Sequence, residues 1–386
     1  MIEIIKNMFR RKMRTLLTIF GIAIGILALV VMGGISEKLN LLVDGGVKYY
    51  KDKVSISGEM SGYTSTPLQM SKKAELEKIE GVQAVFGETY VSLSKDLSAV
   101  NFGPPASIVS AEPGSEKYES FKLYISKGRD LVPTDDHKVV IGSDLVKKLD
   151  AKVGKIIKLR DEDYEVVGIY EKTFSTPDTS AFIPFKNGQS LMLSDQPEII
   201  RSNVKVESLV YDFVVYPMPG VNPDELAKKI EAEVNGITAI GPKAFQDQIA
   251  STVKIFTSII YGIGAISLLV GSLSIINTMT MSISERIKEI GIKKALGAKP
   301  RSIMAEYLTE AGIIGLVGGL IGIGFGVLIA NGINSILEKT GDKIFLMSPR
   351  LLIGSLIFSV ILGIVAGLYP AYYATKINIV KALREE

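Results

Sequence analysis

The chain has 386 residues, which suggests two or three domains, and it combines 47% hydrophobic with 22% charged residues. This mixture excludes both an ordinary soluble enzyme and a simple bundle of membrane helices, so we expect one part in a membrane and one part in water. The net charge of +3 is too small to indicate nucleic-acid binding, and the lack of cysteine excludes disulfides, thiolate catalysis and cysteine-ligated metals.

An amphipathic helix is expected at residues 1–14, because Ile2, Ile5, Phe9 and Met13 fall on one side of a helical wheel and the charged and polar side chains of Glu3, Asn7, Arg10 and Arg14 on the other. Such a helix lies along the inner surface of a membrane, although its charges could equally serve only to orient the chain. The apolar run at 16–35 is about 20 residues long, enough to span a bilayer and longer than the core of a signal peptide. It therefore predicts an uncleaved anchor with a cytoplasmic N-terminus.

Residues 36–254 contain no apolar run long enough to span a membrane. Short strand-like patches alternate there with helices and Gly/Pro turns, which predicts a folded α+β domain. The expected strands are 54–57, 82–90, 138–141, 155–159, 164–170 and 209–216. Helices are expected at 71–79, with Ser71 as the N-cap, and at 222–234, with Asn222 as the N-cap.

Three further apolar runs, at 255–283, 308–333 and 351–369, predict three more membrane spans. The run at 308–333 contains six glycines between positions 315 and 326, at spacings of three and four residues. The first span carries a similar pair, Gly21 and Gly25. Small residues at this spacing let helices approach closely, either within one subunit or at a sliding or dimer face.

The segment 284–307 is a short loop between two spans and carries six basic residues, which places it on the cytoplasmic side. Ile283, Ile287 and Ile290 recur within it at helical spacing, while charged residues point elsewhere. A plain connection would need only a few polar residues. The pattern therefore favours an amphipathic helix that serves as a docking surface over a merely soluble loop.

Several kinds of chemistry have no support in the sequence. No Gly-x-x-x-x-Gly-Lys-Ser/Thr motif occurs, so the chain is not expected to hydrolyse ATP, and no catalytic or cofactor-binding residue is expected. The only histidine, His137, follows Asp135 and Asp136 in a charged turn and is interpreted as a surface residue, so no metal site is expected. The spans contain almost no ionisable residues, which argues against a proton-coupled transporter or a polar channel.

Three stretches carry a resemblance to a known family. The run at 289–298, EIGIKKALGA, is followed by Pro300 and Arg301; the run at 7–22 reads NMFRRKMRTLLTIFGI; and the C-terminal stretch carries LYPA at 368–371. Together they resemble the cytoplasmic loop, the opening and the closing motif of the MacB/FtsX/LolC-type permeases of ABC transporters. With the spacing between them, these matches extend over the whole chain.

The resemblance implies an α-helical membrane protein with four transmembrane helices and an inserted α+β extracytoplasmic domain of two subdomains. A strand–helix–strand pattern at 53–85 recurs at 209–240, which agrees with a split βαβ-like subdomain. The expected segments are a surface helix 1–14, a first span with its stalk 15–50, a MacB-like core 51–242, a second stalk and span 243–283, a cytoplasmic coupling loop 284–307, a third span 308–333, an outer loop 334–350, a fourth span 351–373 and a cytoplasmic tail 374–386. Within the core, 51–110 and 205–242 would form the βαβ-like subdomain and 111–204 an inserted mostly-β subdomain, while an FtsX-like permease domain would cover 255–380.

The resemblance further implies a multi-pass permease of the cell membrane, with both termini in the cytoplasm, that works as a homodimer or with a close paralogue. A separate cytoplasmic ABC ATPase would bind ATP and Mg²⁺, and an extracytoplasmic adaptor is a further candidate partner. The residues expected to couple to the ATPase are Glu285, Arg286, Glu289, Ile290, Gly291, Lys293, Lys294, Leu296 and Gly297, with charged side chains setting the register and isoleucines filling a groove.

The expected activity is efflux or extraction of a substrate such as a drug, peptide or lipoprotein, driven by movement of the extracytoplasmic domains. Two alternatives remain open: an FtsX-like regulator of cell-wall hydrolases, and a membrane-anchored sensor or binding protein without an ATPase.

Overall fold

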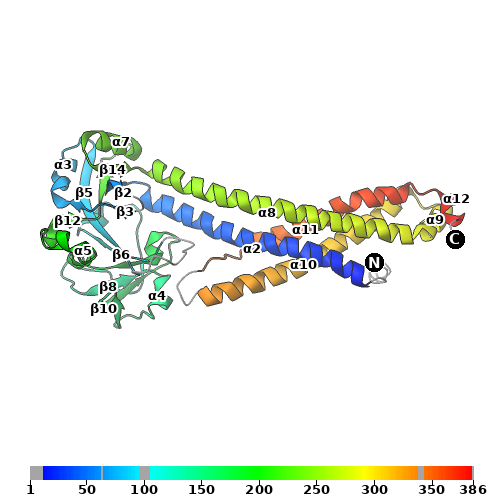
Figure 1. Ribbon diagram of the computed structural model, residues 1–386, viewed down its shortest axis with the longest axis horizontal. Helices are drawn as coiled ribbons and strands as arrows, with labels where there is room; N and C mark the ends of the chain where they lie inside the picture. Colours follow the sequence, from blue (N-terminus) through cyan, green and yellow to red (C-terminus); the bar gives the residue numbers. More distant parts are fainter. Residues whose placement is uncertain (1–11, 62–63, 95–104, 338–342, 385–386) are drawn as a thin grey trace. The chain divides into compact units, whose positions relative to one another are not determined.

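The computed structural model describes residues 12–61, 64–94, 105–337 and 343–384, so most of the helix expected at 1–14 lies outside the described residues (Figure 1). The chain divides into two compact units. A helical unit comprises Met1–Lys38, Lys254–Ser335 and Ile344–Glu386, and an α+β unit comprises Leu39–Val253 and Ile336–Lys343.

Four long helices of the described chain are apolar enough to cross a membrane, which confirms the predicted spans. They are α2 (Lys12–Tyr50), α8 (Pro242–Glu285), α10 (Pro300–Leu337) and α11 (Pro349–Thr375). The helices α2 and α8 continue without a break through the polar stretches that were expected to extend these two spans as stalks. Two short helices, α9 (Ile287–Ala295) and α12 (Ile379–Arg384), complete the helical unit.

Glycines set the close packing of the helical unit. A Cβ at Gly318 would lie 2.8 Å from Cβ of Ile22, and one at Gly322 would lie 2.6 Å from the carbonyl oxygen of Ala23, so both glycines face α2. Gly315 and Gly319 of the same helix face Ser359 of α11. These contacts show that the four glycines serve helix packing within one chain. Their spacing alone had also allowed a sliding or dimer face.

The pair predicted in the first span also packs against a neighbouring helix. A Cβ at Gly21 would lie 3.4 Å from Oγ of Ser274, and one at Gly25 would lie 3.4 Å from the carbonyl oxygen of Ser267, both on α8. The small residues thus let α2 approach α8 closely, as their spacing indicated.

The α+β unit is built on one sheet in which the strands follow the order β14-β1-β13-β5-β6-β11-β8-β10-β7, with β9 paired to β10. Its strands are β1 (Val54–Gly58), β5 (Val82–Ser92), β6 (Ser107–Ala111), β7 (Ile125–Gly128), β8 (Lys138–Ile141), β9 (Ile156–Leu159), β10 (Glu162–Tyr170), β11 (Ser180–Phe182), β13 (Asp212–Pro217) and β14 (Ile237–Ile240). Two small ladders pair β2 (Met60–Ser61) with β3 (Thr64–Ser65) and β4 (Leu68–Gln69) with β12 (Leu209–Val210). The helices of this unit are α3 (Lys73–Leu76), α4 (Leu145–Lys148), α5 (Phe185–Ser194), α6 (Glu198–Arg201) and α7 (Pro223–Glu233).

Among its described residues, the α+β unit has two large hydrophobic cores and a smaller cluster around Val140, Val167 and Tyr170. One core contains Val54, Phe213 and Ile230, and joins the halves β1-α3-β5 and β13-α7-β14. Their strands interleave in antiparallel pairs, as in a split βαβ arrangement. The other large core contains Val139 and Tyr164 of the inserted part of the chain, together with Val91 of β5 and Ile108 of β6.

The two helix caps predicted for this unit have different outcomes. Asn222 caps α7 as predicted, because its side-chain oxygen accepts a 2.9 Å hydrogen bond from the N–H of Asp224. The N-cap predicted at Ser71 is wrong. A 3₁₀ turn already begins at Met70, and the Ser71 hydroxyl instead donates to the side chain of Gln69.

Candidate functional site: the segment between α8 and α10

The segment predicted as a docking surface contains a short helix with defined ends. The helix α9 begins at Ile287, separated from the end of α8 by the single residue Arg286, and it stops at Ala295. Gly297 then adopts a left-handed conformation with φ of +91°. Its N–H donates to the carbonyl of Lys294, and the N–H of Ala298 donates to that of Lys293, which is a Schellman motif. Pro300 opens α10, where its missing N–H has no cost.

One face of α9 is turned into the chain's own helical unit. Ile290 is 2% exposed, and Gly291 is also buried. Ile290 belongs to the same hydrophobic core as Ile303 and Tyr307 of α10. The side chain of Ile290 is thus part of the core of the helical unit. The isoleucines of this segment were expected to fill a groove on a partner.

Two consecutive lysines connect α9 to the neighbouring helices through an ion pair and hydrogen bonds. Nζ of Lys293 lies 2.7 Å from Oε1 of Glu306 on α10 and 3.2 Å from Oε1 of Glu289. Nζ of Lys294 donates to the backbone carbonyls of Thr375, at 2.8 Å, and Ile377, at 2.6 Å, at the end of α11. The helix α9 is therefore connected to α10 by an ion pair and to α11 by hydrogen bonds.

The environment of Lys293 keeps its ammonium group charged. Burial acts to lower the pKa of Lys293, but its hydrogen bonds with Glu306 and Glu289 outweigh burial, so the pKa lies above its ordinary value. A second ion pair, 3.5 Å long, joins Arg286 to Glu310 on α10. The side chains of this pair are 12% and 5% exposed, so its two charges compensate each other away from water.

The opposite face of α9 and its flanks is exposed. Lys288, Ile292 and Leu296 are spaced by four residues, which places them along one side of α9 and its C-terminal flank, and Glu285 is exposed at the end of α8. Ile292 is 51% exposed and Leu296 is 83% exposed. This face, which we call the outer stripe, presents two apolar side chains flanked by two charged ones.

The structure thus divides the nine predicted coupling residues into two groups. The exposed group is Glu285, Leu296 and Gly297, and the half-buried or buried group is Arg286, Glu289, Ile290, Gly291, Lys293 and Lys294. Two residues of the outer stripe, Lys288 and Ile292, were not predicted. The signal that could have found them is their spacing of eight and four residues from Leu296.

The other candidate from the sequence, the turn at His137, forms a surface contact. Nδ1 of His137 lies 2.9 Å from Oδ1 of Asp136, and the two side chains are 51% and 78% exposed. Across the described parts of the chain, no three histidine or acidic side chains are grouped closely enough to hold a metal ion.

Two protein-family models together match most of the chain. The MacB-like periplasmic core domain matches residues 15–233, and the C-terminal domain of FtsX-like permeases matches residues 261–379. The chain belongs to the MacB/FtsX family of ABC transporter permeases.

The relatives include proteins that match over nearly their whole length and longer proteins that match over part of it. The chain is 30% identical to the uncharacterized ABC transporter permease MJ1507 of Methanocaldococcus jannaschii, over 99% of this chain and 96% of that protein. It is 27% identical to the macrolide export ATP-binding/permease protein MacB of Neisseria gonorrhoeae, over 99% of this chain but 60% of that protein. A solved structure of the periplasmic region of MacB from Actinobacillus actinomycetemcomitans is 15% identical, with a TM-score of 0.36, and covers 53% of this chain and 94% of that one.

Proposed function

We propose that this chain is the permease subunit of a MacB-like ABC transporter and that a separate cytoplasmic ATPase, carrying ATP and Mg²⁺, docks on the outer stripe of α9. The observation that carries this proposal is the division of α9 into a face anchored by ion pairs and an exposed face with two apolar side chains. Binding surfaces commonly combine an apolar centre with a polar rim. Leu296 and Ile292 would supply the centre, and Glu285 and Lys288 would supply the rim.

The contacts of α9 with α10 and α11 make it suited to transmit force. Because Lys293 joins it to Glu306 of α10 and Lys294 joins it to the end of α11, a displacement of α9 acts on both helices directly. ATP-driven closure of the ATPase would move the α9 segments of two permease copies and tilt the spans. Movement of the α+β units, rather than passage through a polar pore, would then drive efflux or extraction of a drug, peptide or lipoprotein.

The proposed topology places both termini and α9 in the cytoplasm and the α+β unit outside it. Short segments beside α9 and the termini are rich in lysine and arginine, which supports this orientation. The match of the α+β unit to a periplasmic core domain agrees with it. The same match, together with the size of that unit, favours this function over an FtsX-like regulator of cell-wall hydrolases.

Replacing Leu296 tests the docking most directly. Leu296 is 83% exposed, so Leu296→Ser should leave folding intact while lowering binding and stimulation of the ABC ATPase by at least about tenfold, the loss of roughly 1.4 kcal/mol. The measurement is co-purification with a candidate ABC ATPase from the same organism, followed by ATP hydrolysis in nanodiscs. Ile199→Ser, at a residue of the α+β unit that is 76% exposed, is the matched control. Unchanged binding and stimulation in Leu296→Ser would rule out the outer stripe as the docking site.

A further inference from the structure

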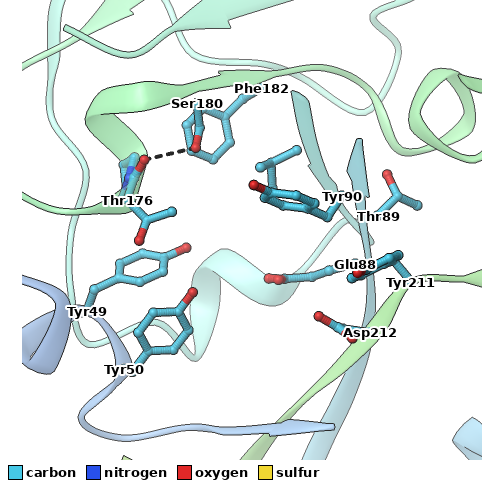
Figure 2. A pocket seen from close by; sticks show the side chains of 12 residues that line it. Tyr49, Tyr50, Glu88, Thr89, Tyr90, Thr176, Ser180, Phe182, Tyr211 and Asp212 are labelled. Carbon is cyan, nitrogen blue, oxygen red and sulfur yellow. Dashed lines mark hydrogen bonds between the residues drawn. The ribbon is translucent and has the colours of Figure 1, made fainter. Parts of the chain in front are cut away.

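A small cavity with a mixed polar and aromatic lining lies inside the α+β unit, between the end of α2, the strands β5 and β13, and the turn before β11 (Figure 2). Its volume is about 80 Å³. That is several times the roughly 10–15 Å³ needed for one water molecule and well below the about 300–1,000 Å³ of pockets for drug-sized ligands. The cavity can therefore hold a small group but not a macrolide or a folded peptide.

Two carboxylates meet in this cavity. Asp212 on β13 and Glu88 on β5 are direct cross-strand partners, a position in which like charges destabilise a sheet. Oδ1 of Asp212 is buried and has no hydrogen-bond partner among the described residues. Buried polar atoms without a partner are rare in native proteins and call for a specific explanation.

Aromatic hydroxyls face the same space as the carboxylates. Figure 2 shows the phenol oxygens of Tyr49, Tyr50 and Tyr90 turned toward the space that the side chains of Glu88 and Asp212 enter. The lining thus combines negative charge, acceptor oxygens and aromatic rings, the three features by which proteins recognise ammonium groups.

The lysine whose charge acts on Glu88, Lys53, forms its ion pair with a different carboxylate. Nζ of Lys53 lies 2.7 Å from Oε1 of Glu119 and 3.7 Å from the centre of the Tyr49 ring, and its side chain is 3% exposed. No ion pair joins Glu88 or Asp212 to a lysine or arginine in the part of the chain that the structure describes. Beside the cavity, the chain therefore already holds one ammonium group with a carboxylate and a tyrosine face.

We propose that this cavity binds the head of a small primary aliphatic ammonium ion. Its three N–H donors would be shared between the two carboxylates and the phenol oxygens, and its first methylene groups would contact the tyrosine rings. A hard divalent cation fits less well, because Ca²⁺ takes six to eight oxygen ligands and Mg²⁺ a strict octahedron, whereas two carboxylates contribute here. This site is independent of ATPase docking, and its small volume distinguishes it from a site for a large exported substrate.

The protonation of the two carboxylates supports the same assignment. Burial and the neighbouring Glu88 raise the pKa of Asp212 to about 7, and burial also raises the pKa of Glu88. Without a ligand, the site therefore tends to keep a proton. A bound ammonium ion would replace that proton as the compensating charge.

The test is calorimetric titration of the full chain in nanodiscs at about pH 8 with n-butylammonium chloride, and with n-butanol as the neutral isostere. We expect saturable binding of the ammonium ion only, weakened at least tenfold in Asp212→Asn and in Glu88→Gln. Glu77→Gln, at an exposed carboxylate of the same unit, is the matched control and should bind as the wild type does. Titration with Nα-acetyl-lysine amide shows whether a lysine side chain can supply the ammonium group in place of a free amine.

Three results would overturn the proposal: no saturable binding to the wild type, equal binding of n-butanol, or undiminished binding by both carboxylate variants. Neutralising one of two repelling carboxylates should not unfold the domain, and circular dichroism of each variant checks this. If a variant nevertheless fails to fold, the comparison of n-butylammonium with n-butanol on the wild type decides.

Discussion

The packing of α10 against α2 leads to a prediction that a single methyl group can test. In Gly322→Ala the new Cβ would lie 2.6 Å from the carbonyl oxygen of Ala23 and 2.9 Å from Cβ of Ile26, where ordinary contacts begin at 3.4 Å. The first of these atoms is backbone and cannot rotate away, so α2 and α10 must separate by about 0.8 Å, the difference of these two distances. Overpacking of this kind costs about 1–3 kcal/mol.

The matched control lies two residues further along the same helix. A Cβ at Gly324 has no atom within 4 Å, so Gly324→Ala should keep or raise stability, by up to about 1 kcal/mol from helix propensity. Unfolding of the purified full chain in mixed micelles, followed by circular dichroism, should therefore place the two variants at least about 1–2 kcal/mol apart. Equal stability of Gly322→Ala and Gly324→Ala would refute the close approach of α2 and α10.

Two further predictions concern charged groups. Because the pKa of Asp212 is raised to about 7, the folded domain keeps a proton that the unfolded chain releases near pH 4, so its stability should fall as the pH rises from about 4 to about 7 and then level off. Asp212→Asn should flatten this slope in thermal unfolding measured across that range, and an unchanged slope would contradict the assignment. Lys293→Glu should lower ATPase stimulation by breaking the ion pair with Glu306, and the double exchange Lys293→Glu with Glu306→Lys should restore part of it. If the double exchange does not restore ATPase stimulation, the effect of Lys293 does not come from its ion pair with Glu306.

The membrane helices could be predicted from the sequence because their signal is local. A run of about 20 apolar residues satisfies its own backbone hydrogen bonds as a helix, so its identity does not depend on a neighbour. The cap at Asn222 is local in the same sense, since its partner, the N–H of Asp224, lies two residues away. These features were predicted correctly.

Other elements of the α+β unit depend on distant partners and were not predicted. The strand β11 has three residues, Ser180–Phe182, and is defined only by its pairing with β6 and β8. The helix α5 carries Asn187 and Gly188, which are poor helix formers. At Gly188 a Cβ would clash with the hydroxyls of Thr89 and Ser110, so packing against the sheet requires glycine there. Tertiary contact overrides local propensity in this helix.

The same distinction explains how well the candidate site could be predicted. The amphipathic pattern indicates that α9 is a helix, but the partners of its lysines lie further along the chain: Glu306 is 13 residues from Lys293, and Thr375 is 81 residues from Lys294. The sequence offered no way to distinguish a lysine that faces a partner protein from one that binds its own chain.

This distinction changes how docking on α9 should be tested. Lys293 pairs with Glu306, so a charge reversal there disturbs the chain's own packing and any partner contact together. Leu296 is 83% exposed, so a change at this position acts mainly on what binds from outside. If docking depends on the outer stripe, Leu296→Ser should lower binding at unchanged stability, whereas Lys293→Glu should weaken coupling even where the ATPase still binds. The two variants thus separate attachment of the motor from transmission of its force to α10.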